Sequence, residues 1–157
     1  MRKQSLMVAV GALAMIALAG NMMSAEKENP RFGKWKIKSD APAPTSNIMT
    51  YEPFGKNGMK ITVDAVNKDG VKTQWWYTTN FDGKDEPVTG SPANDATSVR
   101  MITPAINEII NKKDGKITQI LTNVLSPDHN TIGVIYMRQN EEGKTTNVTF
   151  ATYLRMP

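Results

Sequence analysis

The sequence predicts an all-β protein, a single antiparallel up-and-down meander of eight or nine strands that closes into a barrel. Short segments with strand-like alternation are separated by turns rich in Gly, Pro, Asn and Asp, and the hairpin turn Lys-Asp-Gly occurs twice, at 68–70 and 113–115. No internal segment carries a convincing helical pattern. Sequential hairpins favour a barrel, because closure removes exposed strand edges, and a β-sandwich is the alternative.

The first 25 residues have the plan of a secretory signal peptide. Arg2 and Lys3 form a basic start, and the apolar run Leu6–Gly20 is shorter than the ~20 residues that a membrane span needs. Small residues then offer cleavage after Ala19 or after Ala25. We therefore expect a periplasmic or secreted protein of the bacterial envelope, without a membrane span after cleavage, in which residues 26–157 form one domain.

Composition excludes several classes of protein and site. Without Arg2 and Lys3, 17 basic residues face 15 acidic ones and form no run, which argues against a nucleic-acid partner. The chain contains no Cys. Disulfides, a lipidated Cys anchor and Cys-containing metal or catalytic sites are therefore excluded.

Four strands are predicted in the first part of the chain, at 31–38, 47–53, 59–66 and 71–81. The first of them alternates cleanly, with Trp35 and Ile37 on one face and lysines on the other. A connection with two prolines follows it. The turns Gly55–Gly58 and Asn67–Gly70 separate the later strands, and Asp-Gly in the second of these turns supplies the positive φ of a tight hairpin.

The fourth strand carries the densest aromatic cluster of the chain. Because successive side chains of a strand point to opposite faces, Trp75 and Tyr77 share one face while Trp76 points the other way. Phe81 ends the same segment. These four residues are the candidate lining of an apolar ligand cavity. The competing interpretation is that the inward-facing ones only fill a small barrel, whose interior is just wide enough for side chains.

The segment Asp82–Asp95 is predicted to be the longest irregular loop, because Asp82-Gly83, Pro87 and Gly90 interrupt strand pairing. Its acidic residues could hold Ca²⁺, but their spacing matches no calcium loop. A solvated structural loop without metal is the favoured interpretation. Paired catalytic carboxylates would have to flank a cleft, and nothing in the spacing places any two of them so.

Five strands are predicted in the second part of the chain, at 96–102, 105–112, 117–125, 131–138 and 145–154. The segment 105–112 is ambiguous, because Ile106, Ile109 and Ile110 would also suit one face of a helix. A strand is favoured, since eight residues are few for a helix and the hairpin turn Lys113–Gly115 follows directly.

Candidate catalytic groups are scarce. His129 is the only histidine and lies in the turn Ser126–Asn130, which suits an exposed turn residue better than a catalytic triad. We therefore expect neither catalytic residues nor a cofactor, and a protein that is not an enzyme.

Two motifs resemble those of a family of small exported bacterial proteins with lipocalin-like (calycin-type) β-barrels. Gly33-Lys34-Trp35 is similar to the Gly-x-Trp motif of calycin barrels, and Phe81–Gly90 is similar to a Y-D-G-K-D-Y-P-V-x-G segment of the exported family. A third motif, Ser-x-Asp-Gly, appears as Ser126–His129 without its Gly. The Thr-Asp-Tyr motif and the cysteines of lipocalins are missing.

The resemblance implies a lipocalin-like barrel whose base is closed by a basic residue lying over the Gly-x-Trp indole. The matching residue is Arg155 at the end of the last strand, which would close the barrel together with Gly33 and Trp35, and Arg138 is the second choice. The leading hypothesis is an exported, non-enzymatic barrel that binds a small apolar or amphipathic ligand. The alternative is an envelope structural or protein-interaction module with a filled interior.

Overall fold

The structure, a computed structural model, describes residues 28–43 and 45–157, so the predicted signal peptide lies outside the described residues. It contains ten strands: β1 (Gly33–Ile37), β2 (Ser46–Phe54), β3 (Gly58–Val66), β4 (Lys72–Thr79), β5 (Asp82–Pro87), β6 (Ala96–Thr103), β7 (Ile106–Lys113), β8 (Lys116–Leu125), β9 (Thr131–Gln139) and β10 (Thr145–Arg155). The predicted all-β class is confirmed. Within the described ranges no helix has the length and apolar character of a membrane span.

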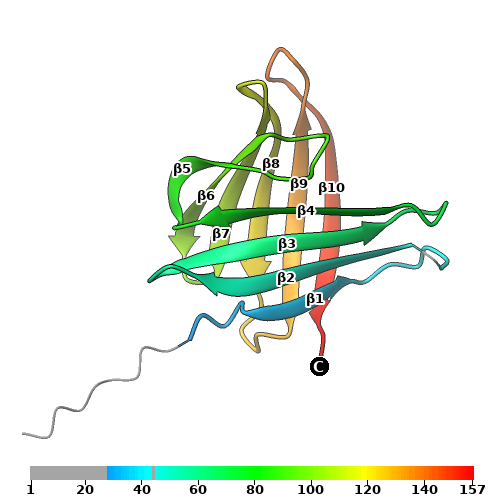
Figure 1. Ribbon diagram of the computed structural model, residues 1–157, viewed down its shortest axis with the longest axis vertical. Coiled ribbons are helices and arrows are strands. Elements are labelled where there is room, and N and C mark those ends of the chain that lie inside the picture. The colour runs from blue at the N-terminus through cyan, green and yellow to red at the C-terminus, as the bar shows by residue number, and fades with distance from the viewer. Residues whose placement is uncertain (1–27, 44) are drawn as a thin grey trace, which may run out of the picture.

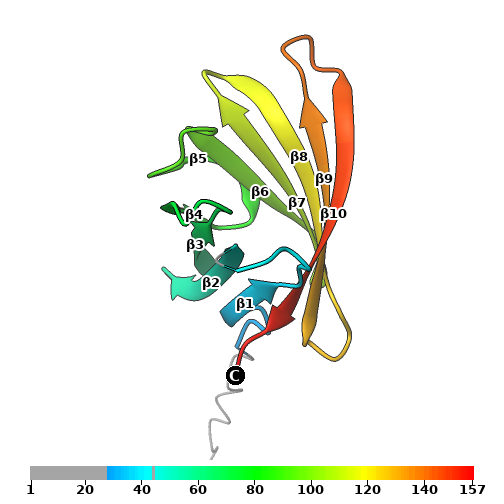
Figure 2. The same cartoon turned by 90° about the vertical axis from the view of Figure 1, so that its right-hand side faces the viewer.

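All ten strands belong to one antiparallel sheet, in the order β4-β3-β2-β1-β10-β9-β8-β7-β6-β5. The first and last strands of the chain are neighbours, because β1 pairs with both β2 and β10. The two ends of the sheet, β4 and β5, do not pair as strands, and an isolated bridge between Trp76 and Thr89, just beyond β5, connects them. The sheet therefore curls into a nearly closed barrel, in which β1–β4 run across β6–β10 (Figures 1 and 2).

The hairpin turns hold the register through side-chain amides. Asn67 Oδ1 accepts hydrogen bonds from the backbone N–H groups of Asp69 and Val71, both at 2.9 Å. Asn140 makes the same pair of contacts in the β9–β10 turn. In the β7–β8 turn, Asp114 and Gly115 both have positive φ, at 50° and 74°. Such a two-residue turn matches the twist of the strands that it joins.

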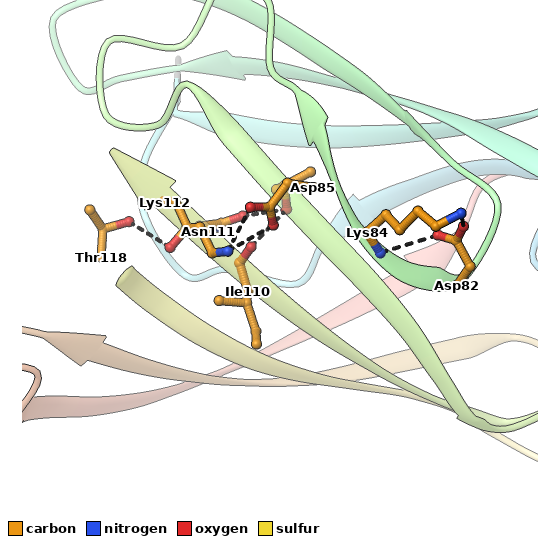
Figure 3. A network of polar contacts seen from close by, with 8 residues as sticks. Asp82, Lys84, Asp85, Ile110, Asn111, Lys112 and Thr118 are labelled. Carbon is orange, nitrogen blue, oxygen red and sulfur yellow. Dashed lines mark hydrogen bonds and ion pairs between the residues drawn. The ribbon is translucent and has the colours of Figure 1, made fainter. Parts of the chain in front are cut away.

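One prediction about the strands is wrong: Asp82–Asp95 is not one irregular loop. Its first residues form β5, which pairs with β6, so the described part of the chain has ten strands rather than eight or nine. β5 is an edge strand of polar residues with a register shift between Asp82 and Asp85, and it lacks the apolar alternation by which strands are recognised. Asp85 accepts hydrogen bonds from Lys112 of β7 at 2.6 and 2.8 Å, and Lys84 pairs with Asp82 (Figure 3).

The ambiguous segment 105–112 is a strand, as favoured. β7 is paired on both sides, with β6 and with β8. Ile109 points into the barrel between Asn107 and Asn111, and Ile110 lies on the outer face. The helix-like spacing of the isoleucines arises because both faces of this strand carry apolar side chains.

The core lies between β1–β4 and β6–β10. Its buried apolar side chains are Trp35, Met49, Tyr51, Met59, Ile61, Val63, Tyr77, Val99, Ile109, Leu121, Leu125, Ile132, Val134 and Tyr153. The upper ends of β9 and β10 extend past β4 (Figure 1). Every residue from Thr145 to Phe150 is consequently exposed on both faces of β10.

Candidate ligand cavity and barrel base

A partly open cavity of about 70 Å³ lies inside the barrel. Its walls come from both halves of the sheet: Asn47, Met49 and Tyr51 on β2, Ile61 and Val63 on β3, Trp75 and Tyr77 on β4, Ile109 and Asn111 on β7, Leu121 and Asn123 on β8, Val134 on β9 and Tyr153 on β10. Apolar walls with a few convergent polar groups are typical of small-molecule sites. The volume is far below the roughly 300 Å³ at which such pockets usually begin.

Trp75 and Tyr77 form the aromatic wall of this cavity. Their side chains point inward from β4, and the two rings stack with centroids 6.0 Å apart and planes inclined by 13°. Strand alternation alone places these two residues on one face. This part of the predicted ligand-binding set therefore lies at the cavity.

The other two members of that set lie elsewhere. Trp76 points outward from β4 and is 37% exposed, with the Lys60 ammonium 5.0 Å from its ring centroid. Phe81 lies beyond the end of β4 with φ of 60° and packs against the core without lining the cavity. Strand alternation already separates Trp76 from its neighbours, and the structure places its side chain outside this cavity.

Asparagine side chains supply most of the polar groups in the cavity wall. Asn111 Oδ1 accepts a hydrogen bond from Thr97 at 2.8 Å, and Asn123 Nδ2 donates to the Tyr51 hydroxyl at 3.3 Å. Asn47 Oδ1 differs from these groups, because it is buried and has no hydrogen-bond partner. An unpaired buried acceptor costs about 1–3 kcal/mol. A donor on a bound molecule would remove that cost.

A buried arginine lies beneath the cavity. Arg31 is only 2% exposed; its Nη1 donates to Asn123 Oδ1 and its Nη2 donates to the carbonyl of Ala105 at 2.6 Å. None of the ion pairs among the described residues includes Arg31. Desolvation lowers the pKa of its guanidinium, and the neighbouring Tyr51 acts in the opposite direction.

Arg31 was missed in the sequence, although a signal was present. Arg31 lies just before β1 and four positions from Trp35. In an extended segment this spacing puts both side chains on the same face, which for Trp35 is the interior. An arginine at the beginning of a strand is usually exposed, so composition argued against burial.

All four tyrosines of the chain are neutral inside the barrel at ordinary pH. Burial raises the pKa of Tyr51 to about 12, and it also raises the pKa values of Tyr77, Tyr136 and Tyr153. The hydroxyls of Tyr136 and Tyr153 lie 3.2 Å apart. The interior therefore offers phenol hydroxyls and no phenolate to a ligand.

The base of the barrel is closed around Trp35, whose side chain is fully buried. Its Nε1 donates to the carbonyl of Arg31 at 2.8 Å. Arg155 of β10 is the residue that pairs with Trp35 of β1. Its guanidinium carbon lies 4.2 Å from the centroid of the Trp35 ring. This distance is within the ~6 Å at which a cation interacts favourably with an aromatic face.

The same guanidinium also connects β10 to the segment before β1 and to the turn before β9. Arg155 donates to the carbonyls of Phe32 and His129, both at 2.8 Å, and to that of Pro30. A Cβ at Gly33 would lie 3.1 Å from Arg155 Nη1, and Gly33 has φ of 120°. Both observations explain why the Gly-x-Trp motif has glycine in its first position.

Two titratable residues of the predicted loops, Asp95 and His129, lie outside the cavity. The carboxylate of Asp95 accepts a hydrogen bond from the backbone N–H of Asp114 at 2.8 Å, which is the main reason that its pKa is lowered. His129 has φ of 60° in the turn that precedes β9. Within residues 28–43 and 45–157, no three His, Asp or Glu residues gather as a metal site would require.

The barrel is similar to solved structures of the fluorescent protein UnaG. The wild-type protein superimposes with a TM-score of 0.55 at 14% identity, over 80% of this chain and 96% of that chain. A point mutant of UnaG gives a TM-score of 0.57 at 14% identity, over 82% and 97% of the two chains. The likeness shows the fold, a calycin-like barrel. No family model and no curated protein sequence matches this chain.

Proposed function

We propose that the protein is an exported, non-enzymatic barrel that binds a small apolar or amphipathic ligand in its interior. The observation that carries this proposal is the unpaired Oδ1 of Asn47 in a cavity walled by Trp75 and Tyr77. A filled barrel built only for stability would gain by pairing that acceptor or replacing it with an apolar side chain.

The residues that line the cavity support a proposal about the chemistry of the ligand. Stacked aromatic rings and aliphatic side chains favour an apolar body. Asn47 Oδ1 favours a hydrogen-bond donor on that body, and the neutral tyrosine hydroxyls add further polar partners. The ligand we propose is therefore a small amphipathic molecule with an N–H or O–H group.

A ligand of ordinary size requires the barrel to widen. The cavity of about 70 Å³ compares with roughly 30 Å³ per water molecule in the liquid. The seam between β4 and the segment after β5 is the weakest part of the wall, because Trp76 and Thr89 supply its two backbone hydrogen bonds, each of 2.9 Å. We place the entry of the ligand at this seam.

Adjacent tryptophans provide a matched test of the cavity. The binding of an environment-sensitive apolar dye, such as 1-anilinonaphthalene-8-sulfonate, would be titrated with the Trp75→Ala and Trp76→Ala variants. We expect Trp75→Ala to change dye affinity and Trp76→Ala to leave it unchanged, because only Trp75 lines the cavity. Equal effects of the two variants would contradict an interior site. Native mass spectrometry of protein from its own envelope fraction would then identify a natural ligand.

The small cavity also supports a second candidate function, a filled barrel that serves as a structural or protein-interaction module of the envelope. On that hypothesis no small molecule would co-purify with the protein in repeated preparations, and the dye would bind neither tryptophan variant nor the unchanged protein.

Export is part of the proposal and rests on Arg2, Lys3 and the apolar run Leu6–Gly20. The mature chain should begin at Gly20 or Glu26 and be found in the soluble envelope fraction. N-terminal sequencing after cell fractionation tests this, and a full-length chain among integral membrane proteins would contradict it.

A further inference from the structure

The outer face of β8–β10 carries no charged side chain along most of its length. Buried residues such as Leu121, Val134 and Tyr153 fix which positions point inward, so the alternate positions point outward. Between residues 118–124, 131–139 and 146–154 these outward positions hold only Thr, Ile, Val, Met, Gln, Gly, Phe and Leu. Phe150 is 76% exposed, and Val148 and Leu154 are nearly half exposed.

The outer face of β2–β4 on the other half of the barrel is different. Glu52, Lys60 and Asp64 point outward there. Asp64 accepts a hydrogen bond from Gln74 at 2.7 Å, and Lys60 lies over Trp76. That half of the barrel therefore has the charged surface expected of a solvated sheet, which makes the uncharged β8–β10 face an exception within the same fold.

The strand register arranges the apolar side chains of this face in a continuous row. Val148 pairs with Met137, Met137 with Ile120, and Ile120 with Ile110. The row crosses four strands, and the rest of the described barrel does not cover it, since β1–β4 lie on the opposite side of these strands (Figure 2). Three strands spaced by ~4.8 Å, with alternate residues ~6.8 Å apart, give this face a projected area of roughly 500 Å².

Next to the row, the face has one projection and one notch. Phe150 pairs with Ile135, while Gly133 pairs with Thr152, so Phe150 and Gly133 are diagonal neighbours on adjacent strands. An aromatic residue in that position can cover a strand glycine. Here it does not, because a Cβ built at Gly133 meets no atom within 4 Å. Both the ring and the notch remain available to another molecule.

We propose that this outer β8–β10 face binds a second copy of the chain in a two-fold symmetric dimer. A two-fold axis in the plane of the face, bisecting the line from Phe150 to Gly133, places the ring of each copy over the notch of the other. A symmetric interface requires such self-complementarity. Two faces of roughly 500 Å² together reach the ~1,000 Å² at which specific interfaces begin. Pairing an uncharged face with its copy also buries no unpaired charge.

Two variants test the dimer from its two sides, with analytical ultracentrifugation of the purified protein as the readout. Phe150→Lys removes the projection and adds charge. Gly133→Val fills the notch, and the open space around Gly133 and the strand propensity of Val should leave the monomer folded. Phe54→Lys is the matched control, because Phe54 is 43% exposed but lies at the end of β2.

The unchanged protein and Phe54→Lys should sediment at twice the mass of the monomer, while Phe150→Lys and Gly133→Val should sediment as monomers with unaltered circular dichroism. The proposal is overturned if the unchanged protein is a monomer at tens of micromolar, or if the dimer persists in both variants. A monomer that binds phosphatidylcholine vesicles through Phe150 would assign the face to a lipid surface instead. Open-ended polymers would exclude the two-fold arrangement.

Discussion

Arg155 lies over the indole of Trp35 and donates hydrogen bonds to three backbone carbonyls around it. One side chain of β10 thus covers the indole at the barrel base and binds the carbonyls of Pro30 and Phe32, in the segment that enters β1. The contact was predicted from the Gly-x-Trp motif, and its contribution to stability is open to measurement.

Replacing both members of this pair should show energetic coupling. Trp35→Ala should lower the free energy of unfolding by ~3–5 kcal/mol, as for large core aromatics. Arg155→Ala should lower it by ~1–3 kcal/mol, because a cation–π contact and charged hydrogen bonds are lost. The double variant should lose at least ~0.5 kcal/mol less than the sum, measured by urea unfolding. Arg138→Ala, at an exposed position, is the control and should change the free energy of unfolding by less than ~0.5 kcal/mol. If the double variant loses the full sum of the two single losses, Trp35 and Arg155 are not coupled.

The buried tyrosines should make the fold sensitive to alkali. Their pKa values are raised in the folded state, so below pH ~10 the phenols are neutral in both states and stability is fully present. Above that pH the unfolded chain releases protons that the folded chain keeps. Stability should fall by about 1.4 kcal/mol per pH unit for each tyrosine involved.

The alkaline transition can be followed by tyrosinate absorbance together with circular dichroism. Tyrosine ionisation and loss of structure should occur in one step. Tyr77→Phe keeps the ring and removes an ionisable group, so it should make the pH dependence shallower. Gradual ionisation with intact structure would show that the phenols are accessible to solvent.

A disulfide across the seam should close the proposed entry route. Trp76 and Thr89 form a mutually hydrogen-bonded antiparallel pair, whose Cα atoms lie ~5.5 Å apart in such ladders, within disulfide range. Because the chain has no Cys, a Trp76→Cys/Thr89→Cys variant can form only this crosslink within one chain. Dye uptake measured by stopped flow should be slower in the oxidised than in the reduced form. Identical rates would place the entry elsewhere.

The acidic residues of β5 should contribute little to stability. Asp85 pairs with Lys112, but the Asp85 side chain is 47% exposed, and exposed ion pairs contribute ~0–1 kcal/mol. Joint replacement of Asp85 and Glu86 by Asn and Gln should therefore change the free energy of unfolding by less than ~1 kcal/mol. Elemental analysis provides the second measurement, because release of a stoichiometric metal by this substitution would overturn the structural role of the segment.

Strand periodicity made most of this fold predictable. Nine of the ten strands follow from alternating apolar residues and from Gly- or Asp-containing turns, which are local signals. β5 has no such signal, because an edge strand of polar residues is defined by its partner β6 and not by its own sequence. The single bridge that closes the barrel between β4 and Thr89 was likewise not predictable, because it depends on how two separate segments meet in space.

The candidate site was only partly predictable. Strand alternation puts Trp75 and Tyr77 on one face and Trp76 on the other, but it does not say which face is inward. The same rule extended from Trp35 to Arg31 would have placed Arg31 inside. The unpaired Asn47 Oδ1 could not be found in this way, because satisfaction of a polar group depends on which side chains from other strands reach it.

The pairing of β1 with β10 also determines when the barrel can form. The hydrogen bond from Arg155 to Phe32 joins residues 123 positions apart, so barrel closure depends on contacts between segments that lie far apart in the sequence. Such contacts are slow to form, because a long loop must be ordered before they contribute. While the final strand remains inside the ribosomal exit tunnel, Trp35 has neither its strand partner nor its guanidinium cover. The ten-stranded wall is therefore completed only after β10 has left the tunnel.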